Sequence, residues 1–172
     1  MKTLINFLKR FAVSAVISIG LLVVGAKADA TELAVGVHTV SVHTEKTFYD
    51  HENRGLRPFN NTNGGLYLRA SSGIINTSNV TVGFYRNSVY RSTVYATIGL
   101  GHNLTDTINI GGQIGLATGY NKAFGHDGSL MPIGGLTVST KLTKDLTANV
   151  IFVPPVGEGT AGVVHLTFDH KF

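Results

Sequence analysis

The sequence predicts an all-β protein, an eight-stranded antiparallel up-and-down transmembrane β-barrel of the bacterial outer-membrane type. Three observations lead to this prediction. Eight segments of about ten residues alternate between an apolar face and a small or polar face. The connections between them are rich in Asn, Gly, Asp and Ser, which favour turns. The chain begins with the pattern of an export signal and ends in Phe172.

Residues 1–28 have the pattern of a secretory signal peptide. A basic start is followed by an apolar run at 11–24 and then by small residues around Ala28 and Ala30. The apolar run is shorter than the roughly 20 residues that a membrane-spanning helix needs. We therefore expect cleavage after Ala28 or Ala30, and a single barrel domain over 31–172.

The excess of basic residues belongs to this signal. The whole chain has 14 basic and 10 acidic residues, and removal of 1–28 takes away four basic residues and no acidic one, which leaves ten of each. A balanced charge gives no support to a nucleic-acid partner. Cysteine is absent, which excludes disulfides, a thiol nucleophile and a Cys-based metal site.

The predicted strands have a period of two and no helical periodicity. In 107–116, Ile108 and Ile110 share one face, whereas Asn109 and Gln113 share the other. A soluble sandwich also has alternating strands, but an apolar face opposite a small or mildly polar one is typical of a membrane barrel. A closed barrel is the form of sheet that a bilayer allows, because it leaves no unpaired edge. The predicted strands are 33–43, 64–73, 80–87, 92–102, 107–119, 131–142, 146–155 and 161–172.

The last strand adds an independent signal for location. Leu166, Phe168 and Phe172 lie on one face, and Phe172 is the final residue. This resembles the terminal strand by which outer-membrane barrels are recognised for assembly. It implies a location in the outer membrane of a Gram-negative cell and the assembly machinery as a partner through Phe172. We expect a monomer, whose eight strands enclose room for one small ligand rather than an aqueous pore.

Polar residues stand where two predicted strands end. His43 closes the first strand, and Asn87 and Ser88 close the third. In an up-and-down barrel these strands run in the same direction, so their ends share one rim. A hydroxyl, an imidazole and a group that orients the imidazole are what acyl transfer needs. The pattern predicts a catalytic site at His43, Asn87 and Ser88, although His and Ser are also ordinary residues at a wet rim.

The other histidines form no comparable group. His38 has the opposite parity to His43 in an unbroken strand, which predicts a side chain that faces lipid. No pair of histidines has metal-ligand spacing, and no phosphate-binding or dinucleotide-binding fingerprint occurs. We therefore expect neither a metal nor a cofactor.

Two prolines interrupt late strand patterns. Pro132 and Pro154 each remove a ladder donor. In a barrel wall this predicts a local gap through which a lipid chain can pass, so both prolines are candidate substrate-binding residues. The alternative is that they only start or stop strands.

Taken together, these motifs resemble the lipid A palmitoyltransferases of the PagP type. That family has a His at the outer end of its first strand, matched here by "SVH" ending in His43, and then a strand matched by "RPFNNTNGGLYLR" at 57–69. Its Asp-Ser pair corresponds to Asn87 and Ser88 in "FYRNS". Its proline-interrupted strands and its terminus resemble "MPIGG", "IFVPPVG" and "FDHKF".

The resemblance implies a fold and an activity. The fold is an eight-stranded barrel that holds an acyl chain, and the activity transfers a palmitoyl group from a phospholipid, the acyl donor, to lipid A, the acceptor. His43 would then move protons, Ser88 would supply the hydroxyl, and Asn87 would take the orienting place that is Asp in the family. The alternative is a non-catalytic small barrel that binds lipid or has a structural role. A lipid A deacylase is disfavoured because no H-x-S motif occurs.

Overall fold

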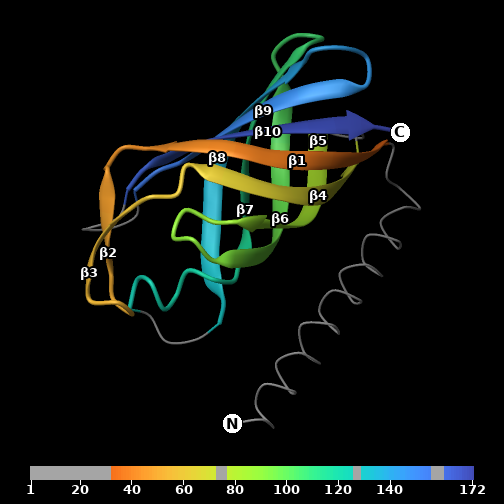
Figure 1. Ribbon diagram of the computed structural model, residues 1–172. Coiled ribbons are helices and arrows are strands. Elements are labelled where there is room, and N and C mark those ends of the chain that lie inside the picture. The colour runs from red at the N-terminus through yellow and green to blue at the C-terminus, as the bar shows by residue number, and fades with distance from the viewer. Residues whose placement is uncertain (1–31, 73–76, 126–128, 156–160) are drawn as a thin grey trace, which may run out of the picture.

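The computed structural model describes residues 32–72, 77–125, 129–155 and 161–172 (Figure 1). The predicted signal peptide at 1–28 lies outside the described residues. The strands are β1 (Glu32–His43), β2 (Thr47–Asp50), β3 (Gly55–Pro58), β4 (Thr62–Ser72), β5 (Thr77–Arg86), β6 (Ser92–Asn103), β7 (Ile108–Ala117), β8 (Met131–Lys141), β9 (Leu146–Val153) and β10 (Val163–Lys171).

Eight of these strands close into an antiparallel barrel. Neighbours around the ring follow the order β1-β10-β9-β8-β7-β6-β5-β4, and β1 pairs with both β4 and β10. The C-terminus lies beside the start of β1, where the Phe172 N–H donates to the Leu33 carbonyl over 3.1 Å (Figure 1). The predicted fold class is confirmed, because the eight alternating segments of the sequence are the eight strands of the barrel.

The connection between β1 and β4 holds a hairpin that the sequence pattern did not predict. β2 and β3 pair with each other in a separate two-stranded sheet, which extends beyond the end of the barrel on the left of Figure 1. Each strand has four residues, which is too short for an alternating pattern to stand out from a polar loop.

The barrel is apolar outside and polar inside. Outward side chains of the wall such as Ile98, Leu100 and Ile114 are 60%, 69% and 65% exposed, as expected for a surface that faces lipid. Inward side chains of the same strands are small or polar, and Thr93 and Thr97 are buried. Among the described residues, no helix is long and apolar enough to cross a bilayer.

The two ends of the barrel differ in the length of their connections. Longer loops mark the extracellular side of outer-membrane barrels and short turns the periplasmic side. We call the end with long connections the outer end and the opposite one the inner end. The outer connections are 44–61, 87–91, 118–130 and 154–162, and the inner ones are 73–76, 104–107 and 142–145.

A bulge in β1 decides which histidines face the interior. The pairing of β1 with both neighbours shifts register between His38 and Val40. The prediction that His38 faces lipid is therefore wrong, since its side chain is 7% exposed and lies inside the barrel. One extra residue reverses the parity of the strand, so His38 and His43 both point inward.

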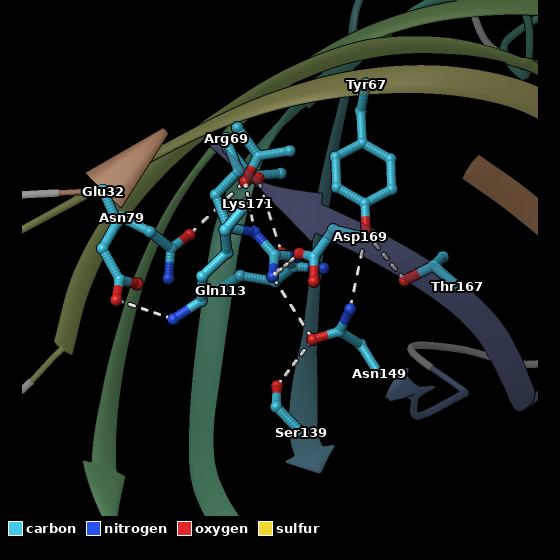
Figure 2. A network of polar contacts seen from close by, with 12 residues as sticks. Glu32, Tyr67, Arg69, Asn79, Gln113, Ser139, Asn149, Thr167, Asp169 and Lys171 are labelled. Carbon is cyan, nitrogen blue, oxygen red and sulfur yellow. Dashed lines mark hydrogen bonds and ion pairs between the residues drawn. The ribbon is translucent and has the colours of Figure 1, made fainter. Parts of the chain in front are cut away.

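Polar side chains fill the inner end of the barrel (Figure 2). Arg69 of β4 pairs with Asp169 of β10 over 2.5 Å and also donates to Asn149 Oδ1 over 3.2 Å. Asn149 in turn accepts from Ser139 and donates to the Tyr67 hydroxyl. This inner ion-pair layer is built from side chains on strands, and its buried charges have partners, as burial in a low dielectric requires.

A middle layer of rings lies between this layer and the outer end. His38 Nδ1 is 2.8 Å from His165 Nε2, and His38 Nε2 is 2.9 Å from the Tyr95 hydroxyl. The ring of Tyr85 stacks on His38 with 4.6 Å between centroids. The two imidazoles and the hydroxyls are hydrogen-bond partners for one another, so they can be buried inside the barrel without unpaired polar atoms.

Candidate active site

His43 and Ser88 meet at the outer end of the barrel, as the sequence predicts. The Nε2 atom of His43 is 2.8 Å from Ser88 Oγ. β1 and β5 run in the same direction, and β4 between them brings their outer ends within side-chain reach of each other. Phe59 holds the imidazole, because the two rings are parallel to within 2° with 4.2 Å between centroids.

The group that orients His43 is Asn61 rather than Asn87. His43 Nδ1 is 2.9 Å from Asn61 Oδ1, which accepts the Nδ1 proton. This tautomer leaves Nε2 free to accept the hydroxyl proton of Ser88. The result is a Ser88–His43–Asn61 row with the polarity of a hydrolase triad, in which an amide oxygen takes the place of a carboxylate.

Asn61 was missed because its position in the sequence carries no distinguishing signal. It stands in "FNNTNGG", where five polar or glycine residues surround it and any of them suits a loop. Its placement comes from the main chain, because the Ser41 N–H donates to the Asn61 carbonyl over 2.9 Å and holds the loop against the end of β1. This contact joins Asn61 to a strand that lies well before it in the sequence, so no local pattern distinguishes Asn61 from its neighbours.

Asn87 is adjacent to Ser88 but points away from His43. Its side chain is fully buried. Asn87 Oδ1 accepts the N–H groups of Val89 and Arg91, and Nδ2 donates to Thr93 Oγ1 and the Gly119 carbonyl. Asn87 therefore folds the turn that presents Ser88, which is a different role from the orienting one that the resemblance implies.

The turn that carries Ser88 is tight. Tyr90 has a φ of 62°, a left-handed conformation that costs a non-glycine residue about 1–3 kcal/mol. Gly119, which accepts the bond from Asn87, has a φ of 86°, and a Cβ there would lie 2.5 Å from the Ser92 carbonyl. The bonds to Asn87 and a glycine at position 119 thus hold Ser88 in place.

A cavity of about 270 Å³ runs inward from this site. His43 and Ser88 line its outer part, and Arg69 of the inner ion-pair layer lines its far end. Apolar side chains such as Ile133 and Ile151 and the rings of the middle layer line the space between them. The arrangement places a hydroxyl, within hydrogen-bond distance of an imidazole, at the mouth of a mainly apolar interior.

The structure places Pro132 and Pro154 at a break in the ladder between β8 and β9. β8 pairs with β9 only from Leu136 onward, and β9 ends at Val153, immediately before Pro154. The part of β8 before Leu136, which includes Pro132, pairs with β7 alone. Pro154 lines both the interior cavity and a second hollow that continues along β8 to Pro132.

No metal site accompanies these residues. Within the part of the chain that the structure describes, no three His, Asp or Glu side chains lie together in a way that would hold an ion.

Comparisons with known proteins bear on the fold. No protein-family model matches the sequence, and no curated protein matches it. A de novo designed transmembrane β-barrel superposes with a TM-score of 0.54 at 15% sequence identity, covering 83% of this chain and 97% of the designed one. This likeness shows the eight-stranded transmembrane barrel fold and nothing finer.

Two natural outer-membrane proteins also match at lower scores. Ail of Yersinia pestis in a phospholipid nanodisc gives a TM-score of 0.46 at 13% identity, over 82% of this chain and 99% of Ail. Neisserial surface protein A gives 0.37 at 14% identity, over 82% of this chain and 96% of that protein.

Proposed function

We propose that the chain is an outer-membrane acyltransferase that moves a palmitoyl or similar chain from a phospholipid to lipid A. The observation that carries this proposal is the Ser88–His43–Asn61 row at the mouth of the interior cavity. Such a row takes the proton from a hydroxyl as its oxygen attacks a carbonyl carbon. The order of motifs from "SVH" to "FDHKF" resembles that of the PagP-type enzymes. This resemblance supports a phospholipid as the acyl donor and lipid A as the acceptor.

The reaction proceeds in two balanced halves. In the first, Ser88 Oγ bonds to the carbonyl carbon of the phospholipid ester while His43 Nε2 takes the hydroxyl proton. The ester bond then breaks, and the lysophospholipid oxygen leaves with that proton. In the second half, a lipid A hydroxyl gives its proton to His43, its oxygen attacks the acyl-Ser88 ester, and Ser88 recovers its proton.

The position of the row suits substrates in the outer leaflet. His43 and Ser88 lie at the outer end, which longer loops mark as the extracellular side. The break between β8 and β9 at Pro132 and Pro154 supports sideways access of an acyl chain from the bilayer to the cavity. The exposed Phe172 at the inner end fits recognition by the outer-membrane assembly machinery.

A non-catalytic barrel that binds lipid is the second candidate. The observation that favours it is the neutral Asn61, since an amide stabilises an imidazolium ion less than a carboxylate does. In this alternative the cavity holds an acyl chain without breaking its ester bond.

Mass spectrometry of lipid A separates the two functions. The full chain is expressed in a Gram-negative host that lacks a palmitoyltransferase of its own, beside the variants Ser88→Ala and His43→Ala. We expect lipid A to gain the mass of one palmitoyl group with the wild-type chain, and a loss of about 10³-fold or more in both variants. Each variant is first shown to be inserted and folded.

The substitution Ser92→Ala is the matched control, because Ser92 is an exposed serine at the start of β6. It should leave the transfer unchanged. A folded wild-type chain that adds no acyl group to lipid A, yet retains a co-purified phospholipid, would reject the enzyme in favour of the lipid-binding barrel.

A further inference from the structure

Tyr120 lies beside Ser88, in the loop that follows β7. Its hydroxyl is 2.8 Å from the hydroxyl of Tyr85, and its oxygen faces Ser88, whose main-chain N–H is directed at it. Tyr120, Ser88 and His43 line the same cavity. The phenol therefore stands at the reacting end of the candidate site, although no sequence motif pointed to it.

Packing holds the ring of Tyr120 in this place. The ring packs against a buried cluster of Tyr67, Tyr95 and Ala117 on the barrel side and against a second cluster of Phe48, Val89 and Ala123 on the loop side. Tyr120 is the residue that the two buried apolar clusters share. A ring fixed from both sides keeps its hydroxyl in position without reorganisation during a reaction, which is what electrostatic catalysis requires.

The phenol is a hydrogen-bond donor at every pH of interest. Burial raises the pKa of Tyr120 well above its ordinary value of 10.0. The group therefore stays protonated. When Tyr85 donates its own hydroxyl proton to Tyr120, the Tyr120 proton is free for a further acceptor.

We infer that the Tyr120 hydroxyl donates to the oxyanion of the acyl transfer and so forms its oxyanion hole, with Tyr85 as a positioning residue. This inference rests on the proposed function. As Ser88 Oγ bonds to the ester carbon, the carbonyl π electrons move to the carbonyl oxygen, which becomes an alkoxide. The alkoxide accepts a hydrogen bond from Tyr120, and no proton is transferred to it. When the intermediate collapses, the carbonyl re-forms and the lysophospholipid oxygen leaves with the proton held by His43.

The position of the Tyr120 hydroxyl relative to Ser88 supports this assignment. The oxygen of a tetrahedral intermediate is bonded to the same carbon as Ser88 Oγ, so it forms close to Ser88. A donor already in contact with Ser88 in the resting site is within reach of that oxygen. His43 occupies the other polar side of Ser88 through its Nε2 atom, so proton transfer and oxyanion binding use different groups.

The test compares Tyr120→Phe, Tyr85→Phe and Tyr49→Phe in the full chain, folded in lipid vesicles. Each change removes one phenol oxygen, and Tyr49 serves as the control because it is 49% exposed on β2. We expect Tyr120→Phe to lower kcat for palmitoyl transfer about 10²-fold with little change in KM for the phospholipid. Tyr85→Phe should give a smaller fall in kcat, about tenfold, and Tyr49→Phe none.

A fluorophosphonate probe provides a second measurement that does not depend on the natural substrate. Its phosphoryl oxygen occupies an oxyanion hole when the phosphorus bonds to Ser88 Oγ and fluoride leaves. Slower labelling of Ser88 in Tyr120→Phe supports the oxyanion hole even if lipid A proves not to be the acceptor. A kcat and a labelling rate within twofold of wild type, or a change confined to KM, would overturn it. A wild-type chain that neither transfers an acyl group nor reacts with the probe removes both the proposed function and this inference.

Discussion

The outer end and the inner end of the barrel both bury polar side chains, but they support them differently. At the inner end, the side chains of Arg69 and Asp169 come from strands and form a charged pair with several further partners. At the outer end, the row of Ser88, His43 and Asn61 is neutral, and two of its three residues lie on loops. Charged side chains therefore lie where regular strands enclose them, whereas the neutral row of Ser88, His43 and Asn61 lies where loops border a cavity.

The largest expected effect of a substitution on stability is at the inner end. Asp169→Ala leaves Arg69 as an unpaired charge among buried groups, which should lower the free energy of unfolding by about 3–5 kcal/mol. Denaturant unfolding in lipid vesicles measures this change. The double variant Arg69→Met with Asp169→Leu should recover most of the loss, because it removes both charges.

Lys171→Met provides the matched control at the same end. It breaks the ion pair between Lys171 and Glu32, whose Glu32 side chain is 49% exposed, and should cost about 1 kcal/mol or less. If Asp169→Ala lowered the free energy of unfolding as little as Lys171→Met does, the inner ion-pair layer would not stabilise the barrel in the way that this comparison of the two ends requires.

The next effect separates the two asparagines of the outer end. Asn87→Asp replaces the amide donor with a carboxylate that faces the Gly119 carbonyl. We expect a loss of about 1–3 kcal/mol in the free energy of unfolding, since the donated bonds to Thr93 and Gly119 disappear. Thermal or denaturant unfolding checks it. A gain in acyl transfer without loss of stability would instead restore Asn87 to the orienting role.

Asn61→Ala should show the opposite pattern, with a change in activity and little change in stability. Loss of the bond to His43 Nδ1 is expected to lower kcat about tenfold, the rate equivalent of one hydrogen bond. The conservative variant Asn61→Asp should retain activity, because a carboxylate also accepts the Nδ1 proton. An Asn61→Ala variant with wild-type kcat would show that His43 is oriented by Phe59 alone.

The smallest expected effect is the response of the β2–β3 hairpin to acid. Asp50 is buried at the end of β2, and hydrogen bonds from Asn53 and then Arg57 and Glu52 hold its pKa below the ordinary value of 3.8, against the opposing effect of desolvation. A carboxyl whose pKa is depressed on folding stabilises the protein above its unfolded pKa, so this contribution is lost as the pH falls below 3.8.

Proteolysis of 47–58 should therefore accelerate below that pH before the barrel opens. In Asp50→Asn the same cleavage should be independent of pH over this range. Acid sensitivity that survives in Asp50→Asn would assign the effect to another carboxyl.

Much of the fold could be predicted because the alternation of apolar and polar side chains can be recognised in each strand separately. Alternation identifies the eight strands, and the same alternation predicts the apolar outer wall. The prediction failed for His38, since a bulge is a property of paired strands and leaves no mark on the spacing of apolar residues.

The candidate site could be predicted only in part. His43 and Ser88 are brought together by strand direction, which follows from the strand count. Asn61 and Tyr120 lie in loops, whose paths depend on contacts such as that of Ser41 with Asn61 and that of Tyr120 with Tyr85. These contacts form between positions far apart in the chain, so no local pattern records them.

The sequence by itself determined an all-β barrel with apolar residues outside and a shared rim for His43 and Ser88, because side-chain alternation and strand direction are local rules. Only the tertiary structure decided that Asn87 folds the turn while Asn61 holds the imidazole. The physical reason is that a side chain bonds to whichever partner the closed barrel brings within about 3 Å, and closure is set by all eight strands together.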